Sequence, residues 1–302
     1  MTAIFVQVFT LFVFVAVGYI LGKKRLVPPE NAGILSTLLV YVVLPCNVFQ
    51  TFSSNFSPSY LSANREMLLV SLLLLAVTIV IGHGVARMLS KEAYESYVYE
   101  YSFIIPNFGY MGYALTEALL GEAGLMNIMV FGLPSTVYLY TVGFAKLTKQ
   151  GLNPKKLINP TVIATVLGIA AGLCGLRIPD AVGGILSKAS VCMGPLSMLL
   201  TGIVVAELPF KEVISNAKVY ILVAVRMFMY PLLMFFVLPF FCSGHILETA
   251  LLFYSLPFGL NTVVFPKLVG EDCRAGTGLA LISTVVACIS LPLLLGFFGI
   301  GT

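Results

Sequence analysis

The hydrophobic residues of this chain fall into long, nearly uninterrupted runs that are separated by short polar segments. A helix needs about 20 apolar residues to cross the hydrocarbon of a bilayer. Continuous runs of this length favour helices over the alternating apolar and polar residues of a membrane barrel strand. The pattern predicts ten transmembrane helices, over residues 3–21, 34–53, 67–88, 97–119, 124–146, 159–176, 183–206, 218–240, 246–268 and 275–299.

The two halves of the chain repeat one another. Gly18, Gly22, Leu26, Pro29, Gly33 and Pro45 return 150 positions later as Gly168, Gly172, Leu176, Pro179, Gly183 and Pro195, and Glu30 returns as Asp180. Five helices are predicted in each half, and an odd number forces the second half to enter the membrane upside down. Inverted repeats are typical of secondary transporters, whose substrate site lies between the two halves. The sequence therefore predicts an all-α fold with repeats over 1–150 and 151–302.

Composition places the chain in a bilayer. Hydrophobic residues make up 59% and charged residues 10% of the chain, whereas soluble domains carry about 25% charged residues. The net charge of +4 does not indicate a nucleic-acid partner, because the positions of the basic residues follow the predicted topology.

The basic residues also predict the orientation in the membrane. If the N-terminus lies outside, the inner loops hold 13 of the 17 lysines and arginines, the outer loops hold three, and one lies within a helix. Cytoplasmic loops are enriched in Lys and Arg. We therefore expect a multi-pass protein of the plasma (inner) membrane with both termini outside. The inner residues are Lys23, Lys24, Arg25, Arg87, Lys91, Lys146, Lys149, Lys155, Lys156, Lys211, Lys218, Lys267 and Arg274.

Two predicted helices, 97–119 and 246–268, contain proline, asparagine and glycine near their middle. A mid-helix proline frees backbone groups, and in a membrane such backbone persists only inside protein or beside a water-filled cavity. We expect the asparagines to cap the restarted half-helices, whose positive ends would attract an anion. Simple proline kinks are the alternative. The predicted substrate-binding residues of the breaks are Pro106, Asn107, Gly109, Pro257, Gly259 and Asn261.

Four further polar residues within predicted helices are candidates. Asn47 either faces the substrate or bonds the carbonyls freed by Pro45, and Ser135 either binds the ligand or bonds its own helix. Glu100 is either a proton-coupling carboxylate or a solvated residue at the inner mouth. Arg226 either extends its charge to the inner surface, or pairs with Glu100 or an anionic substrate.

The sequence predicts no enzyme, cofactor or metal site. It lacks a Gly-rich phosphate loop, an HExxH motif and a Gly-x-Ser-x-Gly motif, and its six cysteines lack metal-binding spacing.

Several short motifs occur in a characteristic order: Ala32-Gly33-Ile34 with Val43-Leu44-Pro45, Pro106-Asn107 with Met111-Gly112, Asn159-Pro160, Val225-Arg226 with Pro231, and Leu256-Pro257-Phe258-Gly259 with Val264-Phe265. In this order and spacing the chain resembles the auxin efflux carrier family, which includes plant carriers of the PIN type and bacterial transporters of malonate and related acids.

The resemblance implies a ten-helix fold similar to those of bile-acid transporters and sodium/proton antiporters. Helices 1, 2, 6 and 7 would form a scaffold, and helices 3–5 and 8–10 a transport domain that moves as an elevator. Pro106, Asn107 and Pro257 correspond to the family's crossover of broken helices. Val48 stands where plant carriers tend to have serine, and their long cytoplasmic loop is missing, which favours a bacterial-type carrier of organic acids.

We therefore expect a secondary transporter of a small carboxylate, such as malonate, another dicarboxylate or an auxin-like acid. A passive channel and a non-transporting sensor for the same anions are the alternatives. A homodimer would supply a fixed scaffold, while proton coupling, sodium coupling and uniport all stay open.

Overall fold

The computed structural model describes residues 2–28, 32–151, 158–206, 216–268 and 274–301, and in this part of the chain the regular structure is helical. The α-helices are α1 Thr2–Lys23, α2 Ala32–Leu38, α3 Leu44–Asn55, α4 Pro58–Leu89, α5 Ala93–Ile104, α6 Tyr113–Phe131, α7 Leu133–Tyr138, α8 Phe144–Leu147, α9 Pro160–Leu173, α10 Asp180–Val191, α11 Met193–Ala206, α13 Ala217–Ala224, α14 Tyr230–Val237, α15 Gly244–Ser255, α16 Asn261–Leu268 and α17 Arg274–Phe298. Among the described residues, four π-helical turns join some of these helices, at Leu39–Val43, Phe108–Gly112, Leu139–Gly143 and Val225–Met229.

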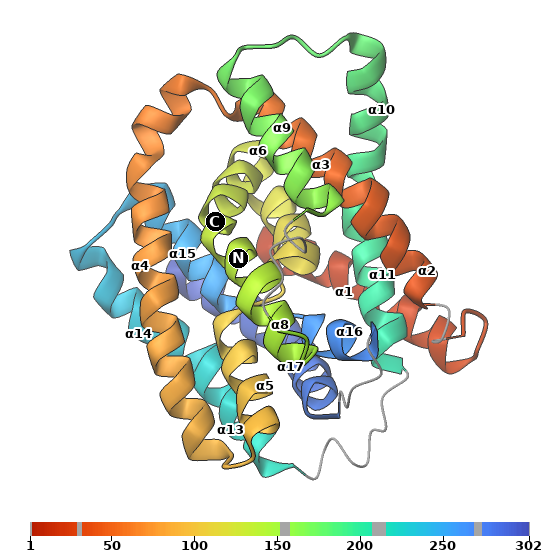
Figure 1. The fold of residues 1–302 in the computed structure, drawn as a ribbon, viewed down its shortest axis with the longest axis vertical. Helices are drawn as coiled ribbons and strands as arrows, with labels where there is room; N and C mark the ends of the chain where they lie inside the picture. Colours follow the sequence, from red (N-terminus) through yellow and green to blue (C-terminus); the bar gives the residue numbers. More distant parts are fainter. Residues whose placement is uncertain (1, 29–31, 152–157, 207–215, 269–273, 302) are drawn as a thin grey trace.

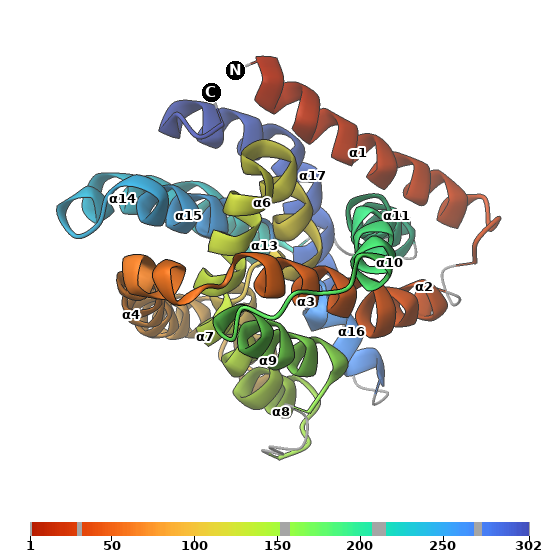
Figure 2. The same cartoon turned by 90° about the horizontal axis from the view of Figure 1, so that it is seen from above.

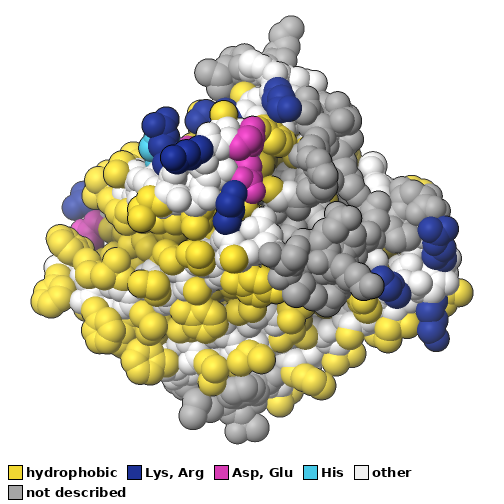
Figure 3. Space-filling model, turned by 90° about the horizontal axis from the view of Figure 1, so that it is seen from below, with side chains coloured by type: hydrophobic (Ala, Val, Ile, Leu, Met, Phe, Trp, Pro, Cys, Tyr) yellow, Lys and Arg dark blue, Asp and Glu magenta, His cyan; other side chains and the backbone are white. Residues whose placement is uncertain are grey.

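Several helices are long and apolar enough to cross a bilayer. Among the described residues they are the six stretches Gly33–Asn55, Pro58–Leu89, Phe108–Phe131, Asp180–Ala206, Ala217–Phe240 and Ala275–Phe298, and Phe9–Lys23 and Pro160–Leu173 are shorter apolar helices. Apolar side chains form a broad area on the face shown in Figure 3, and many large ones are exposed, among them Val80 of α4 at 73%. A bilayer is the solvent that such a surface requires, so the protein is an integral, multi-pass membrane protein.

The two halves of the chain pack on each other reciprocally. Helix α1 of the first half lies along α11 of the second, while α9 of the second half lies along α3 of the first (Figure 2). Figure 1 shows α1, α2, α10 and α11 on one side of the molecule and α4, α13, α14 and α15 on the other. The ends of α1 and α17 that are nearest the termini lie close together in both views.

Four of the glycines that recur in both halves lie at these two helix contacts: Gly18, Gly22, Gly168 and Gly172. A Cβ atom at Gly18 would lie 2.2 Å from the carbonyl oxygen of Leu199 on α11, and one at Gly172 would lie 2.5 Å from that of Phe56 beside α3. Small residues let membrane helices approach until their backbones touch. This part of the sequence repeat is therefore a repeat of helix-packing surfaces.

Gly121 marks a sharp change of direction within α6. Its φ of +66° and ψ of −163° interrupt the helical conformation, and glycine adopts this backbone without the steric strain that a Cβ would add. The sequence predicts a loop between the helices 97–119 and 124–146, and the interruption lies within that loop.

Replacing Gly172 by alanine should destabilise the fold. The new Cβ would meet the carbonyl oxygens of Phe56 and Phe52, at 2.5 and 2.6 Å, and overpacking of this kind costs about 1–3 kcal/mol. Thermal unfolding in detergent should show the loss as a lower midpoint. Gly183→Ala is the matched control, because Gly183 of α10 has no atom within 4 Å of its Cβ position. Equal midpoints for the two variants would contradict the packing role assigned to Gly172.

Candidate functional site

The chain segments that follow α5 and α15 meet and pair through their backbones. The Asn107 N–H donates to the Pro257 carbonyl at 2.8 Å, and the Gly259 N–H donates to the Ile105 carbonyl at 3.3 Å. Together these segments form a short antiparallel bridge. A Cβ at position 259 would lie 3.3 Å from the Ile105 oxygen, so this close approach favours glycine. We call these two segments, 105–107 and 256–260, the paired breaks.

The paired breaks leave backbone carbonyls without their helical partners. In an intact helix the N–H groups of Asn107 and Phe258 would bond the carbonyls four residues earlier, those of Phe103 and Tyr254. The Asn107 N–H instead bonds across the bridge, and the Phe258 N–H donates to Ser283 Oγ of α17 at 3.2 Å. The two carbonyls therefore need other donors, because an unpaired buried carbonyl is unfavourable.

Arg226 supplies both of these donors. Its Nε donates to the Phe103 carbonyl at 2.7 Å, and its Nη1 donates to the Tyr254 carbonyl. The side chain is 0% exposed. The rings of Phe103, Tyr230 and Tyr254 surround the guanidinium, with centroids 5.8, 5.5 and 5.3 Å from Cζ. One residue thus joins both broken helices.

The predictions made for Arg226 are therefore corrected. Extension to the membrane surface is wrong, because the guanidinium is fully buried and bonded to interior carbonyls. Pairing with Glu100 is wrong as well, since the Glu100 carboxylate bonds His83 and Lys146. Arg226 also lies outside the lining of the cavity described next.

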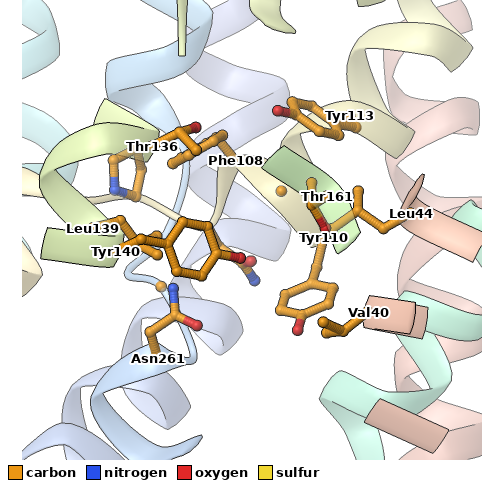
Figure 4. A pocket seen from close by; sticks show the side chains of 14 residues that line it. Val40, Leu44, Phe108, Tyr110, Tyr113, Thr136, Leu139, Tyr140, Thr161 and Asn261 are labelled. Atoms are coloured by element: carbon orange, nitrogen blue, oxygen red, sulfur yellow. The ribbon is translucent and has the colours of Figure 1, made fainter. Parts of the chain in front are cut away.

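A cavity of about 60 Å³ lies between the paired breaks, the helices α3, α7 and α9, and the π-helical turns 39–43 and 139–143 (Figure 4). This volume holds several water molecules or a small ligand. Five of the predicted site residues line it: Pro106, Asn107, Gly109, Gly259 and Asn261. The other described lining residues are Val40, Leu44, Phe108, Tyr110, Tyr113, Thr136, Leu139, Tyr140 and Thr161, and none of the fourteen carries a charge.

The two asparagines present amide groups to this cavity. Asn107 is 3% exposed, and its Nδ2 has no hydrogen-bond partner among the described residues. Asn261 opens α16, and its Nδ2 lies 3.4 Å from the Tyr101 hydroxyl. In Figure 4 the Asn261 and Tyr140 side chains face the space that Tyr110 borders from the opposite wall.

The predicted capping role of the Asn107 side chain is wrong. The residue does precede a helical turn, and its backbone carbonyl accepts from Met111 and Gly112 at 3.2 and 2.9 Å. Its side chain, however, makes no capping bond. Because the amide is not used by the helix, it is available as a donor to a ligand.

Besides Arg226 and Glu100, three predicted residues lie outside the cavity lining. Pro257 belongs to the paired breaks, Asn47 is buried in α3, and Ser135 is buried in α7. The Asn47 Oδ1 has no partner in the described part of the chain. Ser135 is followed by Thr136, which does line the cavity.

Sequence reasoning missed the tyrosines of the cavity and the widened helical turns that carry them. Tyr110 and Tyr140 lie in the π-helical turns 108–112 and 139–143, and Val40 lies in a third such turn. Arg226 lies in the fourth, at 225–229. Such turns occur often at functional sites, but a single sequence has no pattern that marks them.

Glu100 lies in a different hollow. A wide, open hollow of about 690 Å³ is lined by its carboxylate and by His83, Arg87, Lys91 and Lys146, among others. His83 Nδ1 lies 2.8 Å and Lys146 Nζ 3.9 Å from the carboxylate oxygens. Figure 3 shows blue basic side chains gathered around the cyan histidine. We call this hollow the basic vestibule.

Comparison with known proteins shows that this chain is similar to the members of one protein family. The family described as "Membrane transport protein" matches residues 3–156 and 146–295. A protein of Rhizobium meliloti named "Putative malonate transporter" is 22% identical over 94% of this chain and 92% of its own length. An uncharacterized transporter of Methanothermobacter thermautotrophicus is 22% identical over 95% of both chains. A second, from Methanocaldococcus jannaschii, is 24% identical over 63% of this chain and 65% of its own.

Removal of the Ser283 hydroxyl should weaken the fold at the paired breaks. Ser283→Ala leaves the buried Phe258 N–H without its acceptor, and an unpaired buried donor costs about 1–3 kcal/mol. Thermal unfolding of the purified protein would measure this loss. Ser290→Ala is the matched control on the same helix, because the Ser290 hydroxyl is buried and has no partner among the described residues. A larger loss for the control than for Ser283→Ala would refute this account.

Proposed function

Because the chain belongs to this family of membrane transport proteins, the auxin efflux carrier family, we propose that it is a secondary transporter of a small organic anion. The observation that carries the proposal is the cavity at the paired breaks. Its lining, as described above, is uncharged, and it contains an amide donor, Asn107 Nδ2, that has no partner among the described residues. A carboxylate oxygen is the acceptor that would satisfy such a donor.

The helices around the cavity favour a negative ligand. The helix that restarts at Phe108 and the helix that starts at Asn261 both begin at the cavity. The N-terminus of a helix carries a partial positive charge of about half a unit, together with free N–H groups. Anions bind at such ends without a charged side chain. In the proposed complex the substrate carboxylate accepts from Asn107, Asn261 and the tyrosine hydroxyls.

The cavity favours a small substrate. Its volume of about 60 Å³ suits malonate or another short dicarboxylate better than an auxin-like acid with a bulky ring. The relative named for malonate, at 22% identity, supports the same class.

We further propose that transport follows an elevator mechanism in a fold of ten helices and two inverted repeats, 1–150 and 151–302. The reciprocal pairs α1 with α11 and α3 with α9 support a scaffold of helices 1, 2, 6 and 7. Val40, Leu44 and Thr161 border the cavity from that scaffold, whereas Asn107 and Asn261 border it from the proposed transport domain of helices 3–5 and 8–10. When one domain slides along the other, a site at their interface becomes accessible from the opposite side of the membrane. A homodimer in the plasma (inner) membrane, with both termini outside, would anchor the scaffold.

Asn107→Ala should strongly reduce uptake without loss of fold. The change removes a donor from the cavity but breaks no hydrogen bond among the described residues. We expect at least a roughly tenfold fall in malonate uptake by proteoliposomes, which corresponds to one lost hydrogen bond to a charged group at about 1.5–3 kcal/mol. Malonate, succinate and indole-3-acetate should be compared.

The matched control is Asn55→Ala, since the Asn55 amide bonds Thr51 of its own helix, away from the cavity. Full uptake by folded Asn107→Ala would refute the assignment of the site. Uptake that does not saturate would instead identify a channel, and saturable binding without flux would identify a sensor.

The role proposed for Glu100 is to couple transport to the movement of protons. Its buried carboxylate joins α5 to the basic vestibule through His83 and Lys146. Glu100→Gln should then leave uptake insensitive to an imposed pH gradient, because the amide cannot carry the proton. Glu92→Gln, a change at the cap of α5, serves as the control. An unchanged response to the gradient would show that Glu100 does not couple transport.

A further inference from the structure

Arg226 lies where the carbonyl ends of two helices converge. Phe103 and Tyr254, whose carbonyls it binds, lie in the last turns of α5 and α15. The C-terminus of a helix carries a partial negative charge of about half a unit. Two such ends together carry about one unit of negative charge, and the positive charge of one arginine balances it.

No acidic side chain in the described part of the chain shares this charge. Among the described residues Arg226 forms no ion pair with a carboxylate, and its neighbours are two carbonyl oxygens and three aromatic rings. The Tyr230 ring is itself fixed, because its hydroxyl lies 2.6 Å from that of Thr78 on α4. The backbone dipoles and ring faces are thus the neighbours that stabilise the buried cation.

In transporters with broken helices, the unwound carbonyls and the carbonyl ends of half-helices are the groups that bind a coupling cation. Carbonyl oxygens are ligands that hard metal cations prefer. In this chain the guanidinium already occupies that environment. Its planar fork spans two carbonyls on different helices, which a lysine ammonium cannot match in the same geometry.

We propose that Arg226 is a built-in counter-cation of the paired breaks, in the place where a monovalent metal cation such as sodium would otherwise be attracted. The anion site is then assembled without a bound metal ion, and sodium has no role at the paired breaks. Only this consequence for coupling rests on the proposed transport function. The electrostatic role of Arg226 itself is independent of it.

The test is the thermal stability of the purified, full-length protein in detergent, with choline, sodium or potassium chloride at equal concentration. The variants are Arg226→Ala and, as the matched control, Arg65→Ala, which changes an exposed arginine of α4. We expect the wild type and the control to unfold at the same temperature in all three salts. Arg226→Ala should unfold roughly 5–15 °C lower in choline chloride and recover part of that loss in sodium or potassium chloride.

Two results would overturn the inference. The first is an Arg226→Ala variant as stable as the wild type in choline chloride, which would show that no counter-charge is needed. The second is a destabilised variant that neither sodium nor potassium improves relative to choline, which would reduce Arg226 to a hydrogen-bond donor.

If Arg226→Ala does not fold, Arg226→Lys and Arg226→Met decide the question, because they have similar length and differ in charge. The lysine variant should be clearly the more stable, and equal stability would overturn the inference. None of these measurements involves transport. If the protein transports no organic acid but the stability of Arg226→Ala depends on sodium or potassium, the proposed function is refuted and this inference stands.

Discussion

The arrangement of the site depends on one constraint, which is that backbone groups freed inside a membrane protein must find new partners. Pro106 and Pro257 interrupt their helices, and water cannot compensate within the hydrocarbon. The structure provides partners of three kinds: the backbone bridge between the two breaks, the Ser283 hydroxyl and the Arg226 guanidinium. These partners fix the positions of the helix starts that border the cavity.

The sequence indicated where the helices are interrupted more reliably than what the interruptions do. Proline, glycine and asparagine at equivalent places in two repeats follow local rules, and α5 ends at Ile104 and α15 at Ser255, close to both prolines. The role of Arg226 could not be read in this way. A charged residue two turns from a helix end suggests solvent, and only the tertiary structure shows that two carbonyls from distant segments meet it.

The cavity lining shows the same limit of sequence reasoning. Residues within the paired breaks were identifiable, because polar residues beside an interrupted helix are unusual in a membrane. Val40, Thr161 and Tyr140 were not, since they come from three other helical segments that the fold brings together. The Asn107 carbonyl accepts the first bonds of the next helix, as at any helix start. Its side chain borders the cavity and does not cap the free N–H groups of that helix.

The separation of charge at the paired breaks bears on how a transporter could release its substrate. The negative helix ends are matched by Arg226 in the protein interior, while the positive helix ends border an uncharged cavity. If the arginine itself lined the cavity, a carboxylate would form a buried ion pair that is difficult to break. Amide, hydroxyl and backbone donors hold an anion more weakly. A carrier must bind its substrate on one side of the membrane and release it on the other, and a site without a formal charge allows both steps.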